Sequence, residues 1–119
     1  MKTNEIVAAI TGKLVIPPAM DIDLNCGFGS DLMSDVLIFA RPQMLLITGL
    51  TNVQAVRTAE MADIPAIIFV RGKQPQPEVL ELAEEIGIGI ILSAYTMYET
   101  CGLLYQAGLP ALGKIETVQ

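Results

Sequence analysis

The chain lacks histidine and tryptophan, and it contains only two cysteines among its 119 residues. Without histidine, the sequence cannot supply a Ser-His or Cys-His pair or an imidazole general base. Cys26 and Cys101 lie far apart and do not form a CxxC motif, so they do not indicate a zinc site or a disulfide framework. We interpret both as reduced core thiols, because a free cysteine usually packs as a small hydrophobic residue.

Basic residues are also scarce. Seven lysines and arginines stand against thirteen acidic residues, which gives a formal net charge of −6. Proteins that bind nucleic acids gain most of their affinity from basic contacts with phosphates, and anionic membranes attract basic surfaces. The composition therefore argues against nucleic-acid and membrane partners.

Long apolar runs are absent as well. The longest, Ala66–Val70 and Gly87–Leu92, fall well short of the roughly 20 residues that a transmembrane helix needs. Met1–Glu5 is not followed by the small-residue cleavage site of a signal peptide, so we expect a cytoplasmic protein. Apolar residues nevertheless make up 52% of the chain. This content suggests that part of the surface is buried against a partner, most simply a second copy.

Three apolar runs are each followed by a loop and a helical pattern. The strands are predicted at Met44–Thr48, Ala66–Val70 and Ile90–Ser93, and the helices at Val53–Ala62, Pro77–Ile86 and Thr96–Ala107. Continuous apolar runs are typical of strands that are covered on both faces, as in a parallel sheet with βα crossovers. The sequence therefore predicts an α/β fold: a single layered domain over residues 1–119, with a mainly parallel sheet of successive βα units.

The ends of these helices carry expected capping residues. Asn52 can accept a hydrogen bond from the first turn of its helix. Pro77 occupies a first helical position, where its missing N–H costs nothing. Thr96 and Glu99 have the spacing of a capping box.

The N-terminal part, residues 1–25, is predicted to hold a helix and short strands. The helix covers Thr3–Thr11 and is stopped by Gly12, and a strand follows at Leu14–Ile16. Asp21–Asn25 alternates polar and apolar residues, which indicates a half-exposed strand or an extended loop. Gly27-Phe28-Gly29 is predicted to be a turn.

A helix over Leu32–Ala40, capped by Ser30 or Asp31, carries more apolar residues than one buried face needs. Its core face is predicted to consist of Leu32, Val36, Leu37 and Ala40. Ile38 instead lies on the polar side, which suggests either a protein interface or an isolated exposed isoleucine. The candidate interface residues are Leu32, Met33, Val36, Ile38 and Phe39.

A candidate ligand site lies in the loops that follow the predicted strands, because ligands of parallel sheets bind beyond the carboxyl ends of the strands. Its residues are Thr48, Gly49, Thr51, Asn52, Arg71, Gly72, Lys73, Ser93, Tyr95 and Thr96. Arg71 and Lys73 would suit a small anionic or nucleotide-like ligand. The alternative is that these are ordinary polar loop residues.

Other patterns do not complete a known site. Gly27-Phe28-Gly29 lacks the third glycine of a dinucleotide-binding loop, and Asp21-x-Asp23-x-Asn25 lacks the glycine and the final glutamate of an EF-hand. Asp31 and Asp35 share a helix face, but no third metal ligand accompanies them. We therefore predict no catalytic residue, no metal site and no cofactor. An enzyme that uses Asp31 and Asp35 with a divalent metal is the least favoured hypothesis.

Four motifs resemble one family. They are Gly29–Val36, Leu46–Asn52, Val70–Lys73 with the prolines that follow, and Ser93–Thr96. Residues 27–109 resemble the DRTGG domain family, and in particular its small stand-alone members. The chain departs from the family pattern at Leu32, where Arg is common, and at Arg71-Gly72-Lys73, where Thr-Gly-Gly is common.

The resemblance implies a βα-layered fold like the N-terminal domain of HPr kinase/phosphorylase. It also implies a domain without established catalytic activity that helps larger regulated enzymes to form dimers. Stand-alone members resemble accessory proteins that are encoded near iron-hydrogenase and signalling genes. We therefore expect a non-catalytic regulatory or assembly module, a homodimer that docks on a metabolic enzyme, such as a hydrogenase-associated one, or on a signalling partner. The alternative is a sensor of an anionic metabolite or nucleotide.

Overall fold

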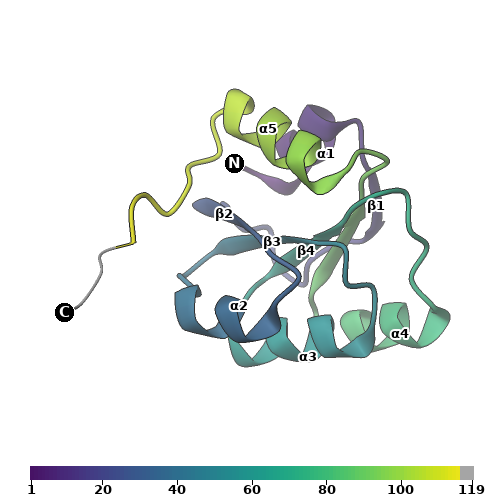
Figure 1. Ribbon diagram of the computed structural model, residues 1–119. Helices are drawn as coiled ribbons and strands as arrows, with labels where there is room; N and C mark the ends of the chain where they lie inside the picture. The colour runs from purple at the N-terminus through teal and green to yellow at the C-terminus, as the bar shows by residue number, and fades with distance from the viewer. Residues whose placement is uncertain (116–119) are drawn as a thin grey trace.

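The computed structural model describes residues 1–115, which form one five-stranded sheet and five helices (Figure 1). The strands are β1 (Lys13–Ile16), β2 (Cys26–Gly29), β3 (Met44–Thr48), β4 (Ala66–Phe69) and β5 (Gly89–Leu92). The helices are α1 (Thr3–Ile10), α2 (Met33–Phe39), α3 (Val53–Met61), α4 (Pro77–Ile86) and α5 (Met97–Ala107). The strand order is β1-β5-β4-β3-β2, with β1 antiparallel to β5 and the other pairs parallel.

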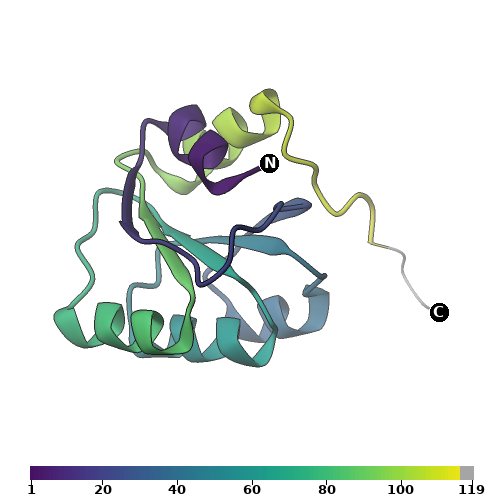
Figure 2. The same cartoon turned by 180° about the vertical axis from the view of Figure 1, so that it is seen from behind.

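The helices cover the sheet in two layers. Helices α1 and α5 lie on one face, and α2, α3 and α4 lie on the other, as the two opposite views show (Figures 1 and 2). This arrangement confirms the predicted α/β fold with a mainly parallel sheet. The three βα units also match their predicted bounds to within one residue at each end.

The central strands are apolar throughout because both of their faces are buried. Side chains alternate between the two faces of a strand. Leu46, Ile67 and Ile90 therefore pack in the core beneath α2, α3 and α4, whereas Leu45 and Ile68 pack in the core beneath α1 and α5. All of these side chains are fully buried.

The predicted turn at Gly27–Gly29 is wrong, because these residues belong to edge strand β2, which pairs in parallel with β3. The glycines are explained by close neighbours. A Cβ on Gly27 would lie 2.9 Å from Cδ2 of Leu109, and one on Gly29 would lie 2.9 Å from Sγ of Cys101. A side chain at either position would force Leu109 or Cys101 to move, so the glycines allow α5 and the residues after it to pack closely against the strand in their present positions.

After α5, the chain crosses the outer edge of β2. The N–H of Gly27 donates to the carbonyl oxygen of Pro110 over 2.9 Å. Leu109 packs in the core on the α5 side, and Leu112 packs against the core on the α2 side. This crossing segment (residues 109–112) covers an edge that would otherwise present unpaired backbone groups.

Several helix ends differ from expectation. Helix α1 ends at Ile10, and Thr11 follows it as a left-handed C-cap with φ of 49°. Thr96 begins α5 without a side-chain capping bond, so the predicted capping box does not form. Asn52, in contrast, accepts a hydrogen bond from the N–H of Ala55 over 3.2 Å, as predicted.

Within residues 1–115, no helix has the length and apolar character that a membrane crossing requires.

Helix α2 is rotated relative to its predicted core face. Met33 and Val36 are buried, which removes them from the candidate interface. Phe39 is half-buried and packs against Phe28, with ring centroids 5.9 Å apart. Leu32, Leu37 and Ile38 are 58%, 45% and 71% exposed. The predicted core positions of Leu32 and Leu37 were therefore wrong, and α2 offers more apolar surface than expected.

Candidate functional sites at the strand ends and on helix α5

The loops after β3, β4 and β5 meet at one edge of the sheet, because these strands are parallel neighbours. Asp31 joins them from the loop before α2. Its carboxylate accepts hydrogen bonds from Oγ1 of Thr48 over 2.9 Å and from the N–H of Gly49 over 2.7 Å. Asp31 is therefore held in place by Thr48 and Gly49 at the end of β3.

Most polar groups of the predicted ligand site already have partners within the chain. The buried hydroxyl of Ser93 is 2.8 Å from Oγ1 of Thr100, and it accepts from the N–H of Tyr95 over 3.2 Å. Nζ of Lys73 donates to the carbonyl oxygen of Gly49 over 2.7 Å. Since Thr48, Gly49 and Ser93 are also buried, these residues mainly hold the loops in place.

The remaining predicted residues stay accessible to differing extents. Thr51, Lys73 and Tyr95 are half-buried, and Asn52, Arg71, Gly72 and Thr96 are exposed. The structure thus brings the loops together, as predicted, but it leaves few free donors on them.

Arg71 is the most unusual residue of this site. Its φ is 66°, a left-handed conformation that is uncommon for any residue except glycine. The conformation is fixed by its N–H, which donates to the carbonyl oxygen of Tyr95 over 2.7 Å. The side chains of Arg71 and Asp31 both lie close to Gly49. A Cβ built on Gly49 would be 3.5 Å from Nη2 of Arg71 and 3.5 Å from the carboxylate oxygens of Asp31. Within residues 1–115, the guanidinium has no carboxylate at salt-bridge distance, so it could bind an anion.

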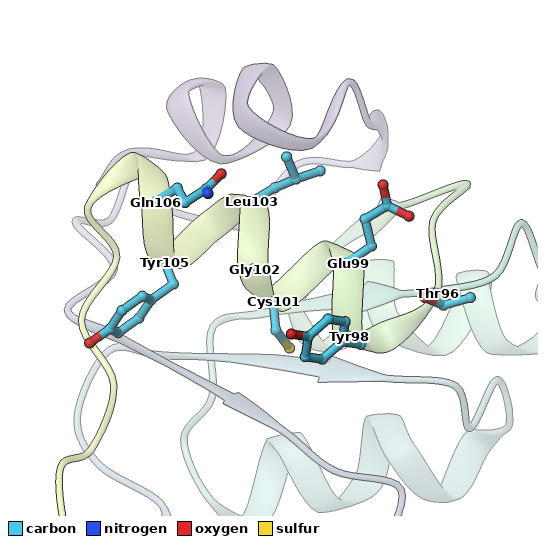
Figure 3. Close-up of a pocket in the computed structure, with 8 residues that line it drawn as sticks. All are labelled: Thr96, Tyr98, Glu99, Cys101, Gly102, Leu103, Tyr105 and Gln106. Carbon is cyan, nitrogen blue, oxygen red and sulfur yellow. The ribbon is translucent and has the colours of Figure 1, made fainter.

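A second candidate site lies on the outer face of α5, where a groove of about 720 Å³ runs along the helix (Figure 3). Tyr98 is 90% exposed and Tyr105 is 66% exposed. Figure 3 shows both rings on the same side of α5, with Cys101 and Gly102 between them. Large exposed aromatic side chains are uncommon in a monomer and enriched at protein interfaces.

Gly102 has no role inside the described part of the chain. A Cβ built on it meets nothing within 4 Å, so an alanine would fit. Glycine inside a helix is nevertheless less favourable than alanine by roughly 0.5–1 kcal/mol. The described part of the chain leaves open space at this glycine, whereas a Cβ on Gly27 or Gly29 would meet a neighbouring side chain.

Both thiols suit a structural role. Burial raises the pKa of Cys26, although the charge of Arg41 opposes this shift, and burial also raises the pKa of Cys101. A higher pKa lowers the thiolate fraction and with it the reactivity. Cys26 is buried and Cys101 is half-buried, and both are free thiols.

No group of three or more Asp, Glu or Cys side chains in residues 1–115 could hold a metal ion. The Asp31 carboxylate, proposed together with Asp35 for a divalent metal, is engaged by Thr48 and Gly49 instead.

Sequence reasoning missed the α5 groove. The signal was present as two tyrosines, at the second and ninth positions of the helix, with a glycine between them. Helical geometry places such positions on one face. Gly102, a glycine inside a strong helical pattern, could have indicated this groove, because such a glycine often has a packing or functional role.

Comparison with solved structures identifies a similar fold. The chain aligns with a crystal structure of the CBS and DRTGG domains of the regulatory region of Clostridium perfringens pyrophosphatase, complexed with the activator diadenosine tetraphosphate. The TM-score is 0.68 and the sequence identity is 15% over 91% of this chain. The alignment covers 47% of the pyrophosphatase chain, so the present chain spans about half its length. At this identity, the likeness concerns the fold.

No curated protein sequence matches the chain significantly. A family model does match: the DRTGG domain model covers residues 5–107, which include every strand and every helix from α2 to α5. The resemblance seen in the sequence motifs is thereby confirmed, and the chain belongs to the DRTGG domain family.

Proposed function

We propose that this chain is a non-catalytic regulatory domain that acts by assembly: a cytoplasmic homodimer that docks on a metabolic enzyme or a signalling protein. The DRTGG domain of the similar solved structure also lies in a regulatory region. The free thiols Cys26 and Cys101 suit a reducing compartment. No histidine is present to accept a proton, which favours a binding role over a catalytic one.

The observation that carries the proposal is the distribution of exposed apolar side chains. One set consists of Leu32 at the start of α2 with Leu37 and Ile38 on the helix, and the other set is Tyr98 and Tyr105 on α5. The two helices cover opposite faces of the sheet (Figure 1), so both groups can be occupied at the same time. One surface can join two copies while the other contacts a different protein.

The docking role is tested with a Leu32→Ser/Ile38→Ser double variant. Both side chains are exposed, so the variant should fold normally. The wild-type chain is used to capture binding proteins from the native cell, and these are identified by mass spectrometry. Each captured protein is then purified and titrated against the wild-type chain and against the double variant. We expect the variant to bind at least roughly tenfold more weakly, a loss of about 1.4 kcal/mol.

Met61→Ser is the matched control, because Met61 is an exposed apolar residue on α3, in the same helix layer. It should bind like wild type. Unchanged affinity in the α2 variant would exclude α2 as the docking surface. A wild-type chain that stays monomeric and binds no protein would contradict the whole proposal.

A second candidate function is that of a sensor for an anionic metabolite or nucleotide. The observation that favours it is the Arg71 guanidinium near Gly49, which has no carboxylate at salt-bridge distance within residues 1–115 and belongs to a residue held in a rare backbone conformation. Such strained residues cluster at functional sites. The similar pyrophosphatase region was solved with a nucleotide activator, which makes nucleotides the first ligands to test.

Arg71→Gly separates this function from a structural role, since glycine accepts the positive φ without strain. We expect ATP, diadenosine tetraphosphate or acetyl phosphate to raise the unfolding temperature of wild type and of Arg41→Ala. The same ligand should not stabilise Arg71→Gly, and it should stabilise Lys73→Ala less than wild type. If the ligand raised the unfolding temperature of Arg71→Gly and of Lys73→Ala as much as that of wild type, the ligand would bind elsewhere.

A further inference from the structure

Gly102 stands in the middle of α5 although no neighbour in the described part of the chain demands a glycine there. A side chain would find open space there, and alanine would make α5 more stable. The missing side chain instead leaves a notch between two exposed tyrosines, in the middle of the groove (Figure 3). A notch of this kind allows another polypeptide to approach the helix backbone closely.

The tyrosines are placed almost symmetrically about this notch. Tyr98 precedes Gly102 by about one helical turn, and Tyr105 follows it by slightly less than one. If two such helices crossed antiparallel at Gly102, Tyr98 of each copy would lie beside Tyr105 of the other. The surface is therefore complementary to itself, as a twofold interface requires.

The charge of the surface also suits a second copy. Each chain carries a formal net charge of −6, so two copies repel one another, and this repulsion is weakest when the surfaces in contact carry no charge. Among the eight described residues that line the groove, Glu99 alone is charged. Its side chain leaves α5 on the side away from Cys101 (Figure 3), so the stripe between the tyrosines is neutral.

The exposed tyrosines supply about half of the area that a dimer needs. An aromatic side chain can bury about 150–250 Å², and Tyr98 and Tyr105 are 90% and 66% exposed, so the four tyrosines of two copies would contribute roughly 500–800 Å². Specific interfaces begin at about 1,200 Å² in total. The remaining area can come from the groove rim, which includes Thr96, Leu103 and Gln106.

We propose that two copies of the chain pair through this face of α5, antiparallel across a twofold axis at Gly102. The inference rests on the proposed homodimer and assigns its contact surface. The α2 surface then stays open on the other side of the sheet for a different protein.

The test compares the dimer dissociation constants of the full chain and its variants by sedimentation equilibrium over a concentration series. Gly102→Glu fills the notch and places two negative charges at the axis. We expect it to weaken the dimer at least roughly tenfold, which corresponds to about 1.4 kcal/mol. Tyr98→Ser/Tyr105→Ser should weaken it similarly. Gln54→Glu adds the same charge at an exposed position on α3 and should leave the constant unchanged.

Gly102→Ala is a second variant that tests the same contact without the risk that the chain fails to fold. In dilute solution, where the chain is monomeric, it should raise the thermal midpoint by a few degrees, because it improves the helix. At high concentration it should still weaken the dimer.

The possible results separate the two proposals. A wild-type dimer that none of the α5 substitutions weakens would overturn the assigned surface and leave the homodimer intact. A wild-type chain that is monomeric throughout the series would overturn both.

Discussion

Thr11 is poorly suited to the backbone conformation that it adopts at the end of α1. It ends α1 with φ of 49° and ψ of 44°, a left-handed conformation that is strongly unfavourable for a β-branched residue. Its side chain is exposed. Glycine is the usual residue at such a position, and the sequence offers Gly12 one position too late, which explains why the predicted end of the helix was wrong.

Thr11→Gly should therefore stabilise the protein by roughly 0.5–1 kcal/mol, because it removes the clash of the Cβ at positive φ. Urea unfolding measures the change. Thr11→Ala is the control: it removes the hydroxyl but keeps the Cβ, and it should give no comparable gain. Equal gains from both substitutions would show that backbone strain is not the cause.

Asp23 is a second residue whose role depends on the tertiary structure. Its carboxylate accepts from the N-terminal ammonium of Met1 over 2.7 Å. This hydrogen bond, helped by the charge of the ammonium, lowers the pKa of Asp23 below its usual 3.8. A lowered pKa in the folded state contributes stability that is present above the unfolded pKa and is lost as the pH falls through the folded one.

Wild type should therefore be more stable than Asp23→Asn near neutral pH, by a small amount since the carboxylate is exposed. The difference should disappear as the pH falls below 3.8. Chemical unfolding at several pH values tests this, with Asp21→Asn as the control. A difference that persists unchanged in acid would exclude the ion pair as its source.

The sequence predicted that the strand-end loops meet at one edge of the sheet, but it did not predict the contacts that their residues make. Arg71 and Lys73 were recognised as the cations of the strand-end loops. Asp31 was expected to cap a helix, yet it accepts from Thr48 and Gly49 on a neighbouring strand end. Contacts between residues far apart in the chain depend on strand order, which local patterns do not contain.

Among the elements, the helix starts differ in how they are capped. Asn52 of α3 accepts from the N–H of Ala55, whereas Gln76 of α4 makes no side-chain capping bond. Both residues are exposed, so each can be replaced without creating a cavity.

Asn52→Ala should cost about 1 kcal/mol, because the first turn of α3 loses an acceptor. Gln76→Ala should cost little. The free energy of unfolding in urea measures both. Equal losses would mean that the hydrogen bond of Asn52 contributes nothing to the stability of α3.

Elements with a strong local pattern were predicted well, and those shaped by their neighbours were not. The strands β3, β4 and β5 are continuous apolar runs and were found almost to the residue. Strand β2 contains Gly27 and Gly29, which normally indicate a turn. Those glycines make room for Leu109 and Cys101, residues that lie far along the sequence.

At the scale of the whole molecule, the crossing segment connects the two cores around the edge of the sheet. Leu109 is 3% exposed and lies against Gly27, whereas Leu112 is half-buried on the other side. The segment therefore belongs to the folded structure, although its sequence gave no sign of a helix or strand.

Leu109→Ala should lower the free energy of unfolding by about 2–4 kcal/mol, as expected for a leucine removed from a core. Leu112→Ala should cost clearly less, because that side chain is only partly buried. Urea denaturation followed by circular dichroism distinguishes the two. Similar small losses would mean that the segment is dispensable for folding.

The antiparallel pairing of β1 with β5 affects how the domain can fold while it is being synthesised. Within residues 1–115, β1 pairs with β5 as its one neighbouring strand and α1 packs on α5, so elements that are synthesised early in this domain contact elements that are synthesised late. At about 5–20 residues per second, roughly 4–15 s pass between the synthesis of β1 and that of β5. During this interval β1 lacks the strand with which it pairs and α1 lacks its neighbour α5, and unpaired strand edges make incompletely folded chains prone to aggregation.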